Sequence, residues 1–309
     1  MFRVGVFLLL CLLLWAIPVS AAPRVLVTIK PIHSLVAGVM AGVGEPDLLI
    51  KGGGSPHDYS LRPSDAKLLG RADLVVRVGE DFETFLNRSL ASLAGKARVV
   101  SLDGLKGITL LPAREGGVWE GHPHHDAGAE EVHAEPEHAE VNLHLWLDPQ
   151  NGRAIVAGLV KALSELDPAN GERYRQNGAT LDRRLVELDG RLAQQLQAVA
   201  DRPFVVFHDA YPYLEKRYNL RAVGSITVSP GRAVGARRLS EIRAKIKATN
   251  ARCVFSEPQF EPKLAVMLTE GTGAATGVLD PEGAGLAPGP EAYFQLLEGL
   301  GRSLRGCLQ

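Results

Sequence analysis

Short apolar runs alternate with amphipathic stretches along most of the chain. The runs are predicted as strands, and the stretches between them, with apolar residues three and four apart, as helices. In the first half the strands are residues 25–29, 48–50, 74–78 and 98–100, and the helices are 34–40, 64–69 and 83–93. In the second half the strands are 204–207, 222–225, 253–255 and 277–279, and the helices are 211–218, 234–248, 262–269 and 291–300. This alternation favours parallel sheets covered by helices on both faces.

A long helical stretch separates the two halves. After a predicted helix at 151–166, leucines recur at helical spacing between Pro168 and Ala200. One helix of about 30 residues would be about 45 Å long, which is enough to run along both halves as a spine. Gly178 and Gly190 are the weak points of this prediction, because glycine destabilises a helix interior. The expected fold is therefore α/β, with two Rossmann-like lobes, each with a parallel sheet, joined by a long backbone helix.

The N-terminus has the pattern of a cleaved secretory signal. One arginine precedes an apolar run at residues 4–17, and the small residues Ser20, Ala21 and Ala22 follow. The run is too short to span a bilayer comfortably, and no later stretch approaches the ~20 apolar residues of a transmembrane helix. We expect an exported chain that begins near Pro23, with an uncleaved anchor as the alternative. The predicted organisation is a signal peptide (1–22), an N-terminal lobe (23–166), a linking helix (167–201) and a C-terminal lobe (202–309).

Removal of the signal leaves two cysteines, Cys253 and Cys307. Two cysteines in an oxidising compartment are expected to form one disulfide. It would tie the C-terminal tail to the body of the second lobe. Two separate buried thiols are the alternative, which the position of Cys307 near the chain end disfavours.

Charge is balanced overall and concentrated locally. The 34 Lys and Arg residues and 35 Asp and Glu residues give a net charge of −1, which is not the electrostatic footprint of a nucleic-acid or membrane-surface binder. Residues 115–140 hold eight acidic residues, five histidines and no Lys or Arg. We expect a flexible loop at 112–141 that collects metal weakly, with a solvated acidic loop as the alternative. Its histidines are His122, His124, His125, His133 and His138.

Three other histidines stand far apart, at the ends of apolar runs. His57 follows the second strand by a glycine-rich loop, His144 lies in the alternating run 141–147, and His208 ends the strand at 204–207. Asp280 ends the strand at 277–279. Ligands bind at the carboxyl ends of strands in open parallel sheets. Three imidazoles and a carboxylate, drawn from both lobes, suit Zn²⁺ in a cleft between them. Each histidine alone could instead be a capping or hydrogen-bonded core residue.

Four segments carry a family resemblance. They are GSPHDYSLRPSDAK (54–67), HLWLDP (144–149), FHDAYPYLEKRY (207–218) and SEPQF (256–260). Together they resemble the zinc-binding periplasmic proteins of ABC importers, the ZnuA type, within the metal-binding cluster A-I solute-binding proteins. The resemblance spans nearly the whole mature chain.

The resemblance implies two α/β lobes bridged by a long helix, and a disulfide at Cys253 and Cys307. It implies His57, His144 and His208 as Zn²⁺ ligands, with the fourth position filled by Asp280 or by water. Manganese and iron relatives place a carboxylate where this chain has His208, and a third nitrogen favours Zn²⁺. The implied function is high-affinity zinc binding and delivery to an ABC importer, a membrane permease with a cytoplasmic ATPase, by a monomeric periplasmic protein.

Neighbouring residues have predicted supporting roles. We expect Trp146 and Tyr59 to pack beside the site and Glu257 to hydrogen-bond a ligand histidine. His33 is expected at a helix start and not among the ligands.

Three alternatives remain. One is a carrier of the same type for manganese or another divalent metal, because copper, nickel and manganese can also bind such a site. Another is a zinc-dependent hydrolase, although the chain has neither a His-Glu-x-x-His helix nor a Gly-x-Ser-x-Gly elbow. The last is a metal-binding adhesin, which the export signal without a lipid-attachment cysteine disfavours. We therefore predict a carrier and not an enzyme.

Overall fold

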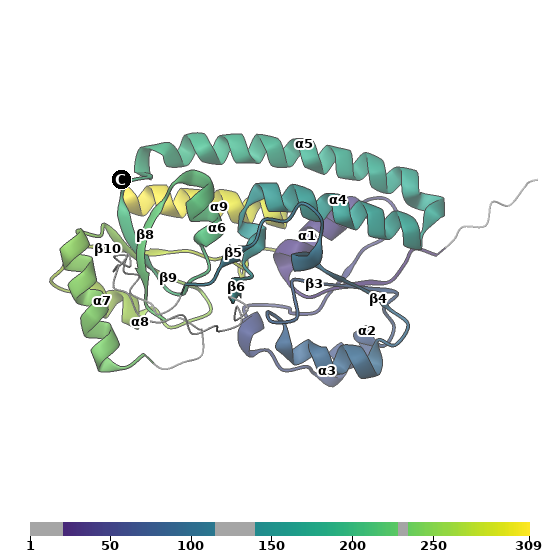
Figure 1. Ribbon diagram of the computed structural model, residues 1–309, viewed down its shortest axis with the longest axis horizontal. Coiled ribbons are helices and arrows are strands. Elements are labelled where there is room, and N and C mark those ends of the chain that lie inside the picture. Colours follow the sequence, from purple (N-terminus) through teal and green to yellow (C-terminus); the bar gives the residue numbers. More distant parts are fainter. Residues whose placement is uncertain (1–20, 115–139, 228–233) are drawn as a thin grey trace, which may run out of the picture.

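Two parallel four-stranded sheets form the frame of the protein (Figure 1). The computed structural model describes residues 21–114, 140–227 and 234–309. The predicted signal peptide, apart from its last two residues, and the five clustered histidines lie outside these residues. The strands of the first sheet are β1 (Val25–Val27), β2 (Asp47–Leu48), β3 (Leu74–Arg77) and β4 (Arg98–Ser101), and those of the second are β7 (Pro203–Val206), β8 (Arg221–Ser225), β9 (Cys253–Ser256) and β10 (Ala275–Val278).

Helices follow the strands in the predicted alternation. In the first half they are α1 (Lys30–Val39), α2 (Pro63–Leu69) and α3 (Thr84–Leu93), and in the second half α6 (Pro212–Tyr218), α7 (Ala236–Thr249), α8 (Lys263–Thr269) and α9 (Ala292–Leu308). Every predicted strand and helix is present, with ends that differ by a few residues. The largest differences are α1, which begins four residues earlier, and α9, which continues to Leu308. The predicted α/β class with parallel sheets is confirmed.

The two sheets share one connectivity. Their strand orders are β2-β1-β3-β4 and β10-β9-β7-β8, and all pairs within them are parallel. In each sheet the first strand along the chain lies between the second and the third. The chain therefore turns in opposite directions after the first and third strands, and their carboxyl ends flank the crevice where ligands bind in such sheets. This structural repeat was visible in the sequence only as the shared strand-helix pattern.

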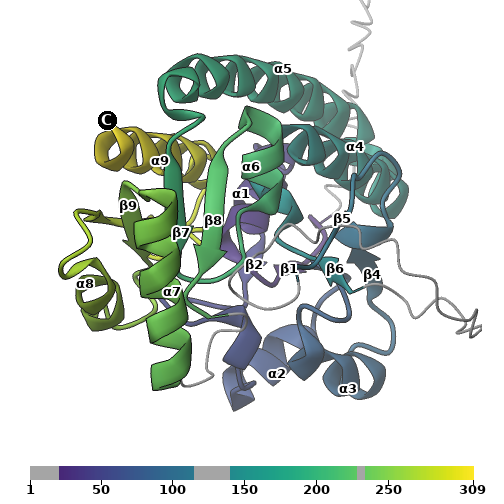
Figure 2. The same cartoon turned by 60° about the vertical axis from the view of Figure 1, so that its left-hand side comes forward.

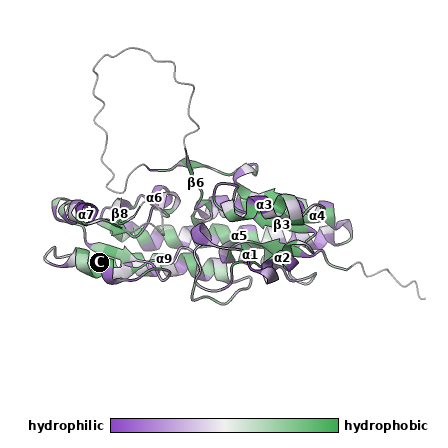
Figure 3. Cartoon of the chain, turned by 90° about the horizontal axis from the view of Figure 1, so that it is seen from below, coloured by the Kyte–Doolittle hydropathy of each residue, from purple (hydrophilic) through white to green (hydrophobic). Residues whose placement is uncertain are grey.

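The linking segment is one helical rod. α5 (Gly171–Leu196) is flanked by 3₁₀ turns at Pro168–Asn170 and Gln197–Val199, so helical geometry extends over the whole predicted stretch. It packs against α4 (Pro149–Leu166), α1 and α9, and it runs along both sheets (Figures 1 and 2). Hydrophobic and hydrophilic residues both occur along the helices (Figure 3), and the buried leucines of α5 recur three and four positions apart, so that they form one face. Gly178 is required by packing, since a Cβ there would lie 2.4 Å from Val160 Cγ2 on α4.

The largest core cluster spans both halves. Strand residues alternate between faces: Val25 and Val27 join this cluster while Leu26 packs under α2 and α3, and Phe204 and Val206 join it while Val205 packs under α7 and α8. The shared face is covered by α1, α4, α5 and α9. The lobe boundaries predicted from sequence stay a prediction, because the core does not divide at them.

A small antiparallel ribbon lies between the sheets. It pairs β5 (Leu111–Pro112) with β6 (Val141–Asn142) and was not expected from the sequence. The predicted disulfide is present and joins Cys253 on β9 to Cys307 on α9. None of the helices in the described ranges has the length and apolar character needed to cross a membrane.

Candidate metal centre

His57 is carried by a tight turn after the second strand. The loop from β2 passes through Gly52, whose φ of +85° favours glycine, and ends in a 3₁₀ turn, Pro56–Asp58. Ser55 caps this turn by accepting a hydrogen bond from the backbone N–H of His57 at 3.3 Å. The predicted position of His57 beyond a strand end is therefore confirmed.

His144 is positioned differently from the prediction. The alternating run 141–147 forms only two residues of strand, and His144 begins a 3₁₀ turn, Leu145–Leu147. The alternation is not that of a half-buried strand, because every residue from Asn142 to Leu147 is buried. Asp148 then caps α4 by accepting from the N–H of Gln150 at 2.8 Å. His144 therefore does not lie at the carboxyl end of a parallel strand.

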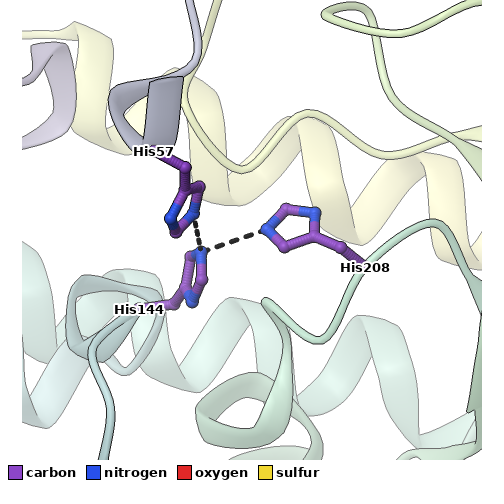
Figure 4. A group of neighbouring side chains, drawn as sticks. All are labelled: His57, His144 and His208. Atoms are coloured by element: carbon purple, nitrogen blue, oxygen red, sulfur yellow. Dashed lines mark hydrogen bonds between the residues drawn. The ribbon is translucent and has the colours of Figure 1, made fainter. Parts of the chain in front are cut away.

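His208 lies two residues beyond β7 and is 4% exposed. Its imidazole points toward those of His57 and His144 (Figure 4), and all three rings line one cavity. The Nε2 atoms of His144 and His208 are 3.1 Å apart, and those of His57 and His144 are 3.4 Å apart. One nitrogen from each of the three rings lies within 4.8 Å of the others. Nitrogens that bind one tetrahedral zinc at ~2.0–2.1 Å are about 3.4 Å apart, so the spacing fits this ion.

Hydrogen bonds outside the triad place lone pairs inside it. Asn142 Oδ1 accepts the backbone N–H of His144, so it faces His144 Nδ1, at 3.1 Å, as an acceptor. His208 Nδ1 faces the carboxylate of Glu257 at 2.7 Å. Both Nδ1 atoms therefore carry the proton in the neutral rings, and both Nε2 atoms present lone pairs. Two lone pairs at 3.1 Å repel each other, and a cation between them removes this repulsion.

Two rings of the triad, those of His57 and His144, are held in their neutral state. Burial, and secondarily the charge of His208, lowers the pKa of His57 to about 3. Burial and the two neighbouring histidines lower the pKa of His144 well below its ordinary value. Metal binding requires neutral imidazoles, so neither of these rings needs to lose a proton at neutral pH. Protons therefore compete with a metal for these two rings only at a pH below 6.5, the ordinary pKa of histidine.

Aromatic rings surround the triad on one side. The ring of Trp146 lies 5.2 Å from that of His144, which confirms its predicted packing. The ring centre of Phe82 lies 4.9 Å from that of His57 and 5.5 Å from that of His144. The sequence analysis did not identify Phe82. Tyr59 was predicted here, but its ring packs on Phe85 and its hydroxyl donates to Asp65 at 2.8 Å, so this prediction is wrong. The apolar surfaces limit water around the nitrogens.

Asp280 is not among the residues that the structure brings together. Within the described ranges, the group that could hold a metal consists of the three histidines. The Asp280 carboxylate accepts the backbone N–H groups of Glu282, Gly283 and Ala284 and the side-chain amide of Gln259. These bonds give it a role in shaping its own loop. His33, as expected, lies in α1, and its Nε2 faces the carbonyl of Pro46 at 2.9 Å.

A cavity of about 620 Å³ opens onto the triad. Its lining includes all three histidines, the carboxylates of Asp81, Glu140 and Asp209, and the guanidinium of Arg114, which pairs with Asp209, so that the carboxylates outnumber the one cation. Acidic groups at an entrance favour the approach of a cation. The site thus combines a nitrogen triangle with an acidic, solvent-connected approach.

Comparison with known proteins places these features in one family. The family model described as "ZnuA: Zinc-uptake complex component A periplasmic" matches residues 25–307. This chain belongs to the ZnuA family. The high-affinity zinc uptake system protein ZnuA of Brucella abortus (strain 2308) is 47% identical over 304 residues, which cover 92% of this chain and 91% of that one. ZnuA proteins are periplasmic solute-binding components and not enzymes, so the hydrolase alternative is set aside.

Solved ZnuA structures share the fold. A crystal structure of ZnuA matches with a TM-score of 0.77 and 24% identity, over 93% of this chain and 100% of that one. A ZnuA deletion mutant with zinc bound matches with a TM-score of 0.75 and 25% identity, over 93% and 98%. These structures confirm the fold, and the family model and the Brucella relative confirm the predicted family, the periplasmic location and the zinc-binding type.

Glu257 is expected to support the site through His208. Its carboxylate, 2% exposed, faces His208 Nδ1 and also accepts the hydroxyl of Tyr211 at 3.2 Å. Glu257→Gln removes the charge that makes the imidazole a better donor to a metal. We expect zinc affinity, measured by chelator competition, to fall by roughly 10- to 100-fold. Glu261→Gln, on the exposed side of the same loop, is the matched control and should leave affinity unchanged. Equal affinities for the two variants would contradict this role.

Proposed function

We propose that this protein captures Zn²⁺ in the periplasm with high affinity and delivers it to an ABC importer. His57, His144 and His208 are the proposed ligands, and a water molecule is proposed to fill the fourth coordination position. The observation that carries the proposal is the convergence of three imidazole nitrogens, with lone pairs fixed by hydrogen bonds on His144 and His208 and with His144 Nε2 at 3.1 and 3.4 Å from the Nε2 atoms of His208 and His57. A carrier must exchange its ion, and the cavity beside the triad provides a path.

The proposed partners are a membrane permease and its cytoplasmic ATPase. The family description makes the chain one component of a zinc-uptake complex. Because a binding component has no energy source of its own, ion entry would require the ATPase. The proposed preference for Zn²⁺ over Mn²⁺ rests on three nitrogens and no carboxylate in the triad, since harder ions favour oxygen.

Two measurements test this function. Metal content is determined for protein purified natively from the periplasm, and growth in zinc-limited medium is followed in a strain that lacks its own ZnuA component. The expected results are one tightly held zinc per chain and restored growth on expression of this protein. Manganese as the retained metal, or restoration by the triple alanine variant of the triad, would overturn the proposal.

The acidic, histidine-rich segment is proposed as a weak auxiliary collector. Deletion of residues 115–139, which keeps the ribbon ends Arg114 and Glu140, should lower the number of zinc ions bound per chain and leave one tight site. Calorimetric titration measures both numbers. A full-length variant with asparagine in place of the segment's five histidines is the matched control for the loss of chain. Loss of the tight site in both variants would contradict the separation of the two groups.

A further inference from the structure

The ribbon that leads to His144 is bonded to the second half of the protein. By chain order it precedes α4 and belongs to the predicted N-terminal lobe. The hydroxyl of Tyr213 on α6 accepts the N–H of Leu111 at 3.0 Å and donates to the carbonyl of Asn142 at 2.6 Å. One buried tyrosine therefore holds both strands of the ribbon. The ribbon is attached to the same β7–α6 connection that carries His208.

Arg114 adds a charged link at the same place. Its guanidinium pairs with Asp209, the neighbour of His208, and with Glu215 on α6 at 2.8 and 2.9 Å. Both carboxylates are at least nine-tenths buried. Burial would lower the pKa of Arg114, but the hydrogen bonds and charges of Glu215 and Asp209 raise it above its ordinary value. A fork that binds two carboxylates at once fixes orientation as well as distance.

Asn142 joins the two histidine turns through one side chain. Its amide nitrogen donates to the carbonyl of Asp209 at 2.6 Å. Its oxygen accepts from the backbone N–H of His144 and faces the ring Nδ1, each at 3.1 Å. The amide orientation is settled by these partners, because a reversed amide would place donors against donors. The turn after His144 is held as well, since Trp146 Nε1 donates to the carbonyl of Pro281 and Tyr293 donates to the carbonyl of Trp146.

His57 is outside this network. In the described part of the chain, its imidazole has no hydrogen-bonded partner other than His144, and its other close ring neighbour besides the triad is Phe82. The three ligands are thus supported unequally. His144 and His208 are tied to one rigid unit, whereas His57 stands on a glycine-containing loop from the first sheet.

We propose that Asn142 and Arg114 are positioning residues that hold His144 and His208 as a preformed pair at metal-binding separation. This inference rests on the proposed ligand role of the triad. Holding two ligands in place before the ion arrives removes the cost of ordering them on binding. Asn142 acts by fixing both the tautomer of His144 and its distance from the His208 turn, and Arg114 acts by fixing that turn against the ribbon.

The test is a set of double variants measured by zinc competition. Asn142→Ala is combined with the wild type, with His57→Ala and with His208→Ala in the full disulfide-bonded chain. If Asn142 is a positioning residue, Asn142→Ala should lower zinc affinity by roughly 10- to 100-fold in the wild type and in the His57→Ala variant. The loss should be less than about 3-fold in His208→Ala, because the pair is already lost there. A merely structural role would cost the same factor in all three backgrounds, and that result overturns the inference.

Matched controls separate this effect from general destabilisation. Asn177→Ala removes an amide that donates to the carbonyls of Val39 and Ala41, far from the triad, and should not change zinc affinity. Arg114→Lys keeps the charge but cannot bind two carboxylates at once. If Asn142→Ala does not fold, Arg114→Lys should lower zinc affinity in the wild type and in His57→Ala, and much less in His208→Ala. Arg153→Lys, at the pair with Asp182, is its control. If the wild type itself lacks a tight zinc site, the proposed function fails, whereas uniform losses with a tight wild-type site refute only the positioning role.

Discussion

Replacing His208 by alanine is expected to weaken zinc binding by roughly 100- to 1000-fold. A structural zinc site of four ligands is worth about 10–16 kcal/mol, so one ligand accounts for about 2.5–4 kcal/mol of it. His208→Ala removes a nitrogen whose lone pair is oriented by Glu257. His144→Ala should cost as much, because its Nε2 is the nitrogen within 3.4 Å of both others. His57→Ala should cost less, since its ring is not fixed by a further hydrogen bond in the described part of the chain.

Chelator competition with protein that lacks residues 115–139 measures these losses, because the weak sites proposed for that segment would otherwise mask them. His33→Gln is the control, since glutamine preserves a donor for the Pro46 carbonyl and His33 lies outside the triad. Circular dichroism and intact disulfide confirm that each variant folds. Wild-type affinity in each of the three alanine variants would refute the ligand assignment.

The fold could be predicted from sequence because its signals are local. Apolar runs such as residues 74–78 and 253–255 become buried strands, and the leucines of α5 fall on one face. Helix starts were less certain. Pro31 at the first turn allows α1 to begin at Lys30, whereas the periodic apolar pattern begins later. The shared strand order of the two sheets depends on which strands pair, which no local pattern records.

The proposed ligands of the site could be predicted from the sequence, but most of the residues that position them could not. His57, His144 and His208 stand out as single polar residues near apolar runs, and Glu257 lies in the SEPQF segment. Phe82, Arg114 and Asn142 lack such a signal because the contacts that place them at the site join distant parts of the chain. His57 and Phe82 are 25 positions apart, Asn142 and Asp209 are 67 apart, and Arg114 and Asp209 are 95 apart. Asp280 carried a plausible signal at a strand end, yet its loop folds back so that backbone N–H groups occupy its carboxylate.

The lowered pKa values of His57 and His144 and the ribbon contacts that position His144 and His208 serve the same function. A zinc carrier must present nitrogens without a proton at neutral pH and must not close up when empty. Burial lowers the pKa of His57 and His144, which meets the first need. The ribbon contacts meet the second, because they hold His144 and His208 apart by bonds that do not involve metal. The lone pairs of the two Nε2 atoms, 3.1 Å apart, repel each other, and a cation between them relieves this repulsion, which favours binding.

Loss of the disulfide is expected to lower the free energy of unfolding by about 4 kcal/mol while leaving a functional zinc site. Cys253 and Cys307 are 54 positions apart, and closing a loop of this length restricts the unfolded chain by that amount in the entropy model. In the folded protein the bond joins α9 to β9, and α9 is already packed against α1 and α5. Glu257 follows β9 directly, but its partners His208 and Tyr211 hold it independently of the cysteines.

Urea unfolding of metal-free protein measures the change, with the Cys253→Ala/Cys307→Ala double variant compared with the oxidised wild type. Wild type under reductant is the matched control, because it loses the same bond without losing the sulfur atoms from the core. Both should show the same fall in stability, and both should still bind one zinc tightly, with saturating zinc recovering part of the loss by mass action. If the unfolding midpoint is unchanged in the double variant and in the reduced wild type, α9 is held by packing alone. If both proteins lose tight zinc binding, the disulfide also supports the contact between His208 and Glu257.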